Sequence, residues 1–184
     1  MIDENLKEVI DEQSVIYDGT VVHLEKWKVT LPDGKPASRE VVLHRGASAI
    51  VPVDGEGNTY LVRQFRAPLM RVLLEVPAGK LDTAGEDRLL AAKRELREET
   101  GFTAEKWTHL VDLATTPGFC SEVISLYLAR GLTRGETEFD DDEFLDIVKM
   151  PFAQAAEMAA RGEIEDAKTV TALLLAQRAM KDER

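Results

Sequence analysis

The sequence predicts an α+β fold, or a β-sheet sandwiched between helices. Three observations support this class. Segments rich in β-branched and aromatic residues, separated by turn residues, fill most of the region 14–66. One charged helix is predicted in the middle of the chain and two further helices near its C-terminal end. The 184 residues contain no repeat or low-complexity linker, so strands and helices are expected to share a core.

The first part of the chain is predicted to be antiparallel β-structure. Its strands are expected at 15–17, 21–30, 38–44, 48–53 and 59–65. Pro32-Asp33-Gly34-Lys35 and Asp54-Gly55-Glu56-Gly57-Asn58 consist of residues that favour tight turns, so both are interpreted as hairpin connections. A short strand, Leu73 to Val76, is stopped by Pro77-Ala78-Gly79 ahead of a polar loop.

The second part combines helices with further strands. A helix is predicted from about Glu86 to Thr100, and Gly101 is expected to end it. Strands follow at 107–114, 123–128 and 144–149, with irregular acidic sequence between the last two. Pro151 is typical of a helix start, and apolar residues at 170 and 173–175 give the last helix a buried side.

Composition limits the classes of function. Asp and Glu total 34 against 23 Lys and Arg, and a net charge of -11 disfavours nucleic-acid binding. A small phosphorylated ligand is still compatible with this negative charge, because divalent cations neutralise both protein carboxylates and ligand phosphates. No apolar run reaches about 18 residues and the first residues do not resemble a secretory signal, so we expect no membrane association and a cytoplasmic location. The single cysteine, Cys120, cannot form an internal disulfide.

The central predicted helix carries a cluster of carboxylates. Glu95, Glu98 and Glu99 lie at positions i, i+3 and i+4, so they share one helix face. Like charges at this spacing repel one another, which makes the cluster costly unless cations occupy it. Charge runs of this kind are, however, common on solvated helix faces. The spacing alone therefore indicates only a candidate cation site.

The residues around this cluster resemble the Nudix box. Glu86, Arg94-Glu95-Leu96, Glu98-Glu99 and Gly101-Phe102 match its positions, and Gly79 stands in the place of its leading glycine. In one departure, six residues separate Gly79 from Glu86, where the family pattern has five. An extra loop residue can bulge without disturbing the helix that follows.

Further segments resemble the ADP-ribose pyrophosphatase branch of this family. They are Ser38 to Val42, Val62 to Arg66, Leu74 to Gly79, Thr116 to Phe119, Asp140 to Phe144 and Ile164 to Thr169. The resemblance covers most of the chain. It implies a Nudix α/β/α sandwich with a mixed sheet at residues 46–184, and an N-terminal antiparallel β extension at residues 1–45 through which a homodimer forms.

The resemblance also implies a metal site. By matching position, Glu95, Glu99 and the backbone carbonyl of Ala78 are expected to be metal ligands. Glu122 matches a further metal-contacting acid, although a surface glutamate at the start of a strand is an equal alternative. These oxygen donors suit Mg²⁺, with Mn²⁺ as the alternative.

The acids expected to act on the attacking water lie elsewhere. Asp141 and Glu143 match the positions at which this branch activates or positions the water, and Glu143 is preferred because Asp141 is one methylene shorter than its usual counterpart. Such an acidic run would ordinarily be solvated loop. Glu98 is a third catalytic candidate and a less certain metal ligand.

The same resemblance gives candidates for substrate binding. Arg66 fits best as the partner of the diphosphate, since its planar fork binds phosphate oxygens in a bidentate way; the alternative is a strand-end arginine paired with a surface acid. The other expected substrate-binding residues are Arg39, Glu40, Arg45, Lys80, Pro117 and Gly118. The first three are often contributed by the partner subunit in this family.

The resulting hypothesis is metal-dependent hydrolysis of ADP-ribose to AMP and ribose 5-phosphate, with water attacking one phosphorus atom. One alternative is a hydrolase of another nucleoside diphosphate sugar, because the metal site recognises only the diphosphate. Another is a non-catalytic Nudix domain that binds nucleotides. That alternative predicts broken box carboxylates or an appended DNA-binding module, and the sequence contains neither.

Overall fold

The computed structural model describes residues 5–83, 85–135 and 144–182, and it divides into two compact units. The first holds the described residues up to Arg45 together with Ala114–Glu122. The second holds Gly46–Leu113 and the described residues from Val123 onward. That residues 1–45 and 46–184 are separate domains stays a prediction.

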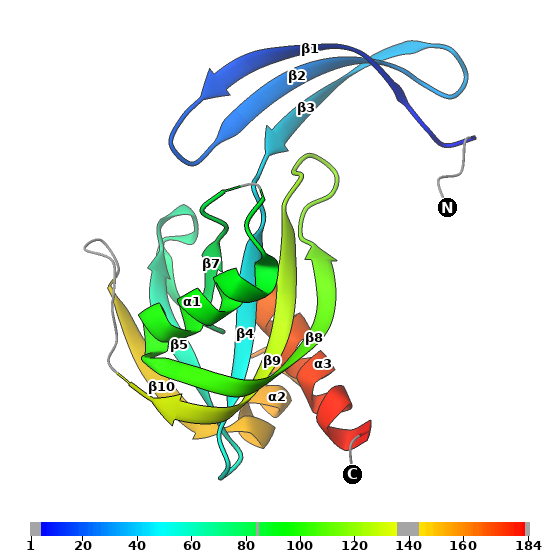
Figure 1. The fold of residues 1–184 in the computed structure, drawn as a ribbon. Coiled ribbons are helices and arrows are strands. Elements are labelled where there is room, and N and C mark those ends of the chain that lie inside the picture. Colours follow the sequence, from blue (N-terminus) through cyan, green and yellow to red (C-terminus); the bar gives the residue numbers. More distant parts are fainter. Residues whose placement is uncertain (1–4, 84, 136–143, 183–184) are drawn as a thin grey trace. The chain divides into compact units, whose positions relative to one another are not determined.

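The first unit is built on a three-stranded antiparallel sheet in the order β1-β2-β3 (Figure 1). Its strands are β1 (Val9–Asp18), β2 (His23–Thr30) and β3 (Pro36–Leu43). Gly34, with φ 84°, closes the turn between β2 and β3 in a conformation that glycine adopts without a steric penalty. Segment 114–122 joins this sheet, because Val42 N donates to Phe119 O at 2.7 Å and Ser121 N to Val42 O at 2.9 Å.

The second unit is built on a seven-stranded mixed sheet with the central order β10-β5-β4-β9-β8. In addition, β6 pairs with β5 and β7 pairs with β4. The strands are β4 (Ala47–Val53), β5 (Asn58–Arg66), β6 (Arg71–Glu75), β7 (Ala78–Lys80), β8 (Phe102–Ala114), β9 (Val123–Arg134) and β10 (Leu145–Pro151). The sheet is mixed because β4 and β9 run parallel, whereas β5 is antiparallel to β10, β4 and β6.

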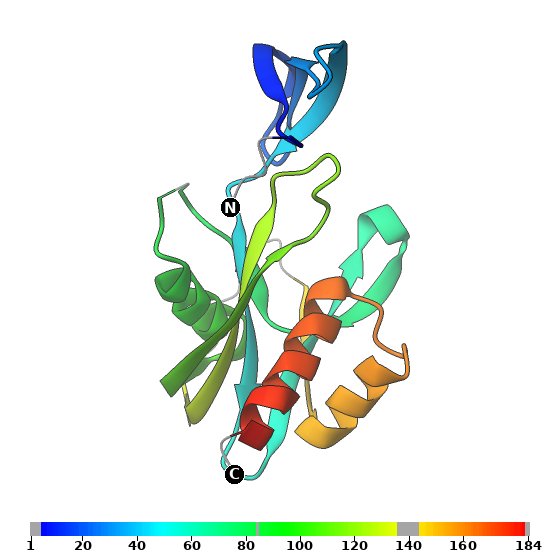
Figure 2. The ribbon, with the colours of Figure 1, turned by 90° about the vertical axis from the view of Figure 1, so that its right-hand side faces the viewer.

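Three helices cover the two faces of this sheet. They are α1 (Arg88–Thr100), α2 (Phe152–Ala160) and α3 (Ala167–Asp182). Figure 2 shows α1, in green, on one side of the sheet and α2 and α3, in orange and red, on the other. All seven residues of β4 are buried, as expected for a central strand covered on both faces. The α/β/α sandwich predicted from the resemblance is confirmed.

The core forms two clusters, one on each face of the sheet. The larger cluster includes Leu61, Leu126, Leu128, Ala155 and Leu173, so it joins the sheet to α2 and α3. The smaller cluster lies beneath α1 and includes Ile50, Ala92, Leu96, Phe102 and Tyr127. Its burial of apolar area is the main force that fixes α1 on the sheet.

The predicted elements agree with the structure apart from a few differences. β7 was not predicted, because Ala78–Lys80 contains no β-branched or aromatic residue. A short 3₁₀ helix, Ala67–Leu69, also joins β5 to β6. β9 runs on to Arg134, into the segment expected to be irregular. No helix among the described residues is long and apolar enough to cross a membrane, and the cytoplasmic location stays a prediction.

Candidate active site

Helix α1 has a defined beginning and end, which fixes the positions of its carboxylates. The side chain of Asp87 caps its first turn by accepting hydrogen bonds from the backbone N–H groups of Leu89 and Leu90, both at 2.9 Å. Gly101, with φ 71°, ends the helix and donates its N–H to Arg97 O at 2.8 Å. The buried residues of α1 are Ala91, Ala92, Glu95, Leu96, Glu99 and Thr100.

Two of the predicted metal ligands, Glu95 and Glu99, lie on the buried side of α1. Their residues are only 7% and 3% exposed, so these carboxylates are not a solvated helix face. A buried charge is costly unless hydrogen bonds or cations compensate it. The alternative of an ordinary charged surface is therefore excluded for this pair.

Strand β7 brings backbone atoms to both carboxylates. Ala78 N donates to Glu99 Oε2 at 3.1 Å. A Cβ on Gly79 would lie 2.0 Å from Cδ and Oε1 of Glu95, so the Glu95 carboxylate occupies the space that any other residue at 79 would need. The pairing of Ala78 with Ala49 fixes β7 against the central strand β4. Glu95 and Glu99 thus both lie against β7, and their role as metal ligands together with the Ala78 carbonyl stays a prediction.

The donor set fits a hard divalent cation, because two buried carboxylates lie against strand β7, which also contains the Ala78 carbonyl that the resemblance names as a ligand. In the described part of the chain, no three histidine, cysteine, aspartate or glutamate residues are grouped so that they could hold a metal ion. A metal at this place would therefore need the carbonyl, water or ligand oxygens as well. Mg²⁺ commonly retains such additional oxygen ligands.

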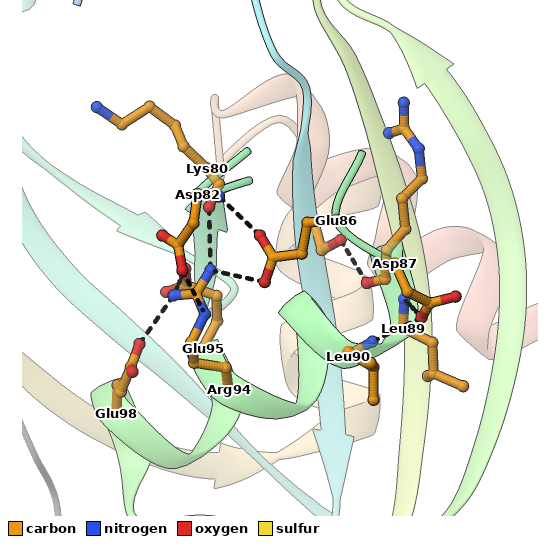
Figure 3. A network of polar contacts seen from close by, with 11 residues as sticks. Lys80, Asp82, Glu86, Asp87, Leu89, Leu90, Arg94, Glu95 and Glu98 are labelled. Atoms are coloured by element: carbon orange, nitrogen blue, oxygen red, sulfur yellow. Dashed lines mark hydrogen bonds and ion pairs between the residues drawn. The ribbon is translucent and has the colours of Figure 1, made fainter. Parts of the chain in front are cut away.

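Arg94 connects the carboxylates of α1 with one another (Figure 3). Its Nη1 donates to Glu95 Oε1 at 2.7 Å and to Glu98 Oε2 at 3.1 Å. Burial by itself lowers the pKa of Arg94, but the adjacent carboxylates, with Glu95 contributing most, raise that pKa overall. Glu98, the catalytic candidate on this helix, is thus held by Arg94, and its catalytic role stays a prediction.

Arg94 also contacts the loop that contains the extra residue. Its Nη2 donates to Lys80 O at 3.2 Å and lies 3.5 Å from Glu86 Oε1, and its Nε lies 3.5 Å from Asp82 Oδ2. Asp82 N donates in turn to Glu86 Oε2 at 2.6 Å, while Leu81 N donates to Gly46 O at 3.1 Å. Figure 3 shows the side chains of Asp82 and Glu86 and the Lys80 carbonyl next to Arg94. The longer loop therefore leaves the carboxylates of α1 in place.

Arg66, the predicted diphosphate partner, lies at the end of β5. Its Nε and Nη2 donate to the two carboxylate oxygens of Glu75, both at 2.7 Å. The hydrogen bonds that Arg66 donates to Glu75 contribute most to raising the pKa of Arg66, and the charge of Glu99 adds to this effect. Arg66 is therefore within electrostatic reach of an expected metal ligand. The alternative interpretation of Arg66 was a strand-end arginine paired with a surface acid. Its partner Glu75 is instead buried.

The first unit contains most of the remaining candidates. Arg39 lies opposite Trp27 in the β2–β3 ladder and donates to Glu8, while Glu40 and Arg45 are exposed. Their roles in substrate binding stay predictions.

Segment 114–122 of the first unit contains Pro117 and Gly118, which are exposed. Glu122 accepts a hydrogen bond from Thr115 Oγ1 at 2.7 Å, and its Oε1 lies 3.5 Å from His44 Nδ1. Its assignment as a metal ligand stays a prediction. Asp141 and Glu143, the candidates for acting on the attacking water, lie outside the described residues.

Glu75 and Lys168 were missed as members of this site. Lys168, at the beginning of α3, donates to Glu75 Oε2. One signal was available in the sequence, because Glu75 is a charged residue inside the apolar strand Leu73 to Val76. Lys168 lies in the segment Ile164 to Thr169 that resembles the family, but that segment does not indicate its partner, since the pairing joins residues 93 positions apart.

Comparisons with known proteins point to one family. A family model described as the NUDIX domain matches residues 42–173. The chain is 41% identical to a methanol dehydrogenase activator of Bacillus methanolicus, over 90% of this chain and 91% of that protein. It is 40% identical to an ADP-ribose pyrophosphatase of Bacillus subtilis, over 92% of each. A crystal structure of an ADP compounds hydrolase superposes with a TM-score of 0.84 at 26% identity, covering 96% of both chains.

Proposed function

This chain belongs to the Nudix family, and on that basis we propose that it hydrolyses the diphosphate of ADP-ribose to AMP and ribose 5-phosphate. The observation that carries the proposal is the convergence of Glu95, Glu99 and the Ala78 peptide at the buried side of α1. Together with the Ala78 carbonyl, these carboxylates would provide the divalent-metal site that diphosphate hydrolysis requires. The similarity to the Bacillus subtilis enzyme over most of both chains supports the choice of substrate.

We assign the divalent cation as Mg²⁺, with Mn²⁺ as the alternative. Glu95, Glu99 and the Ala78 carbonyl would hold it, and Glu122 is a further candidate. When bound, such a cation neutralises diphosphate oxygens and makes a coordinated water more acidic. Arg94 keeps the Glu95 and Glu98 carboxylates in place by donating to both.

The remaining roles are divided between binding and water activation. Arg66 is proposed to bind the diphosphate, with Lys80, Pro117 and Gly118 as further substrate contacts. Glu143, or else Asp141, is proposed to position the attacking water as a general base. Direct attack by water on phosphorus needs no covalent enzyme intermediate.

We also propose that the active form is a homodimer, formed through the first unit. Strand β1 is exposed along its whole length, and it carries Val9, Ile10, Val15, Ile16 and Tyr17. Exposed apolar groups on a sheet are typical of association surfaces. Arg39, Glu40 and Arg45 would then contribute to the site of the partner subunit.

Sedimentation at the assay concentration tests the dimer. Replacing Val15 and Tyr17 by lysine should give a monomer with reduced activity, whereas replacing Lys7 and Lys35, exposed residues of the same unit, by glutamine should leave the dimer intact. A fully active wild-type monomer would contradict the proposal.

A substrate panel tests the proposed reaction. The purified protein is given ADP-ribose, NADH, an ADP-hexose and a capped RNA in the presence of Mg²⁺, and kcat/KM is compared between them. ADP-ribose should be preferred, and EDTA should abolish turnover. Preference for an ADP-hexose would move the assignment to another nucleoside diphosphate sugar. Binding of ADP-ribose without turnover of any compound would support the non-catalytic alternative.

A further inference from the structure

Glu75, the last residue of β6, is a buried carboxylate outside the Nudix helix. It is 1% exposed and lies opposite Val62 in the β5–β6 ladder, between Leu74 and Val76 in sequence. A buried charge in such apolar surroundings is costly unless several donors satisfy it. A strand selected for packing alone would carry an apolar residue at this position.

Two cations from different parts of the fold satisfy Glu75. Arg66 donates to both of its carboxylate oxygens, each at 2.7 Å, through the Nε and Nη2 edge of the guanidinium. Lys168, which is 11% exposed, donates to Oε2 from the beginning of α3. A bidentate contact fixes the plane of the guanidinium as well as its position.

Neighbouring hydrogen bonds fix this end of α3 on β6. Val76 N donates to Thr169 Oγ1 at 2.9 Å, and Thr169 Oγ1 donates to Asp166 Oδ2 at 2.6 Å. Lys168 Nζ also lies 3.1 Å from Asp166 Oδ2. Because Lys168 is held on two sides, it restricts where the Glu75 carboxylate can lie.

Arg66 itself extends from this buried acid towards solvent. Its side chain is 40% exposed, whereas that of Glu75 is 1% exposed. The contact with Glu75 uses Nε and Nη2, and Nη1 makes no hydrogen bond to any residue that the structure describes. The two Nη1 protons are therefore available to a ligand oxygen.

We propose that Glu75 is a positioning residue for Arg66, that Lys168 fixes Glu75, and that the pair directs the Nη1 side of Arg66 at the substrate diphosphate. The inference rests on the proposed function, since it gives Arg66 the role of binding the diphosphate.

A double-mutant cycle between Glu75 and Arg66 tests this role. Glutamine at 75 keeps the shape of the side chain, but it offers only one oxygen acceptor. Its NH₂ group would face an N–H donor of Arg66 or Lys168. Glu75→Gln should lower kcat/KM for ADP-ribose about 10- to 100-fold in the wild-type background. In the Arg66→Ala background the same change should cost less than about 3-fold, because the group that Glu75 positions is gone.

Control variants separate positioning from stability. Glu165→Gln removes a surface carboxylate that pairs with Arg71, the first residue of β6, and it should leave kcat/KM unchanged. Glu75→Asp keeps the charge and should recover part of the activity lost in Glu75→Gln. Thermal unfolding is recorded for every variant, and Arg66→Gln replaces Arg66→Ala as background if the latter does not fold. An equal loss from Glu75→Gln in both backgrounds would overturn the positioning role.

A binding measurement distinguishes this inference from the proposed reaction. The Kd of ADP-ribose is measured in EDTA for the same four proteins, so that no turnover is needed. Coupling in Kd with no hydrolysis by the wild type would support positioning and refute the reaction. Hydrolysis without coupling in either Kd or kcat/KM would refute positioning alone. If ADP-ribose neither binds nor reacts, both proposals are wrong.

Discussion

Gly79 and Glu95 share a space that only one side chain can occupy. A Cβ at position 79 would lie 2.0 Å from Cδ and Oε1 of Glu95, much closer than real Cβ contacts. The backbone does not demand glycine here, because Gly79 is absent from the residues with positive φ among those described. The glycine is required by the buried carboxylate on the neighbouring helix.

Gly79→Ala should therefore impair metal binding more than folding. The added methyl group must displace the Glu95 carboxylate, which is the movable end of its side chain and is held by Arg94. We expect the Mg²⁺ concentration for half-maximal activity to rise by about 10-fold or more. A Mg²⁺ titration of the hydrolysis rate measures this change. Gly85→Ala, in the loop after β7 and with no atom within 4 Å of the new Cβ, should behave like wild type. Equal effects of the two substitutions would contradict the steric argument.

Glu99→Gln should remove a metal ligand while preserving the packing of α1. Glutamine can still accept the hydrogen bond from Ala78 N through its amide oxygen, but it carries no charge for a cation. At limiting Mg²⁺ we expect the rate to fall by roughly 100-fold or more. Hydrolysis at the wild-type rate, with circular dichroism showing a folded protein, would refute the assignment. Glu157→Gln, which removes an exposed acid of α2, is the matched control.

Arg94→Lys should remove the contacts that join the Glu95 and Glu98 carboxylates of α1. A lysine ammonium lacks the planar fork with which Arg94 contacts Glu95, Glu98 and the Lys80 carbonyl together. We expect activity to fall about 10- to 100-fold and thermal stability without metal to decrease, because repulsion between the carboxylates is less compensated. Mg²⁺ should restore part of that stability, which differential scanning calorimetry with and without EDTA measures. A variant whose melting temperature does not respond to Mg²⁺ would argue against a cation among these carboxylates.

Asp54 should contribute a pH-dependent term to stability. Burial raises its pKa, but hydrogen bonds from Asn58, Tyr60 and the Glu56 N–H outweigh this effect and lower the pKa from 3.8 to about 2. Because the pKa is lower in the folded state, the stabilisation is present above about pH 4 and is lost as the pH falls from 4 to 2. We expect about 1 kcal/mol after allowance for screening by solvent.

The comparison of wild type with Asp54→Asn isolates this term. Asparagine retains an oxygen acceptor for the turn but does not titrate. Urea unfolding at several pH values should give a constant difference in the free energy of unfolding above pH 5 and a shrinking difference between pH 4 and 2. A difference that does not change across this range would rule out the shifted pKa.

Most of the fold could be predicted from local sequence patterns. The turn at Asp54 to Asn58, the glycine that ends α1 and the proline at the start of α2 are short-range signals, and the structure confirms each element that they delimit. β7 lacked such a signal, because the strand conformation of its three residues is determined by pairing with β4 and not by their own β propensity.

The site was predictable only to the extent that it follows helical spacing. Glu95 and Glu99 share a face because they lie four residues apart, but the burial of both residues was not predicted and is a finding of the structure. The contacts of Arg66 with Glu75, and of Glu75 with Lys168, depend on how β5, β6 and α3 pack. No local pattern encodes a contact between residues 93 positions apart.

The parallel pairing of β4 with β9 has a consequence for how the chain is made. Ala47 is matched with Ile124, and Val53 with Arg130, so the centre of the sheet joins segments 77 residues apart. During synthesis, β4 and the whole of helix α1 are made before β9. Helix α1 therefore has no complete surface to pack on until β9 has been made, and folding of this unit is expected to follow the synthesis of β9. Chaperones that bind exposed apolar segments would encounter β4 during this interval.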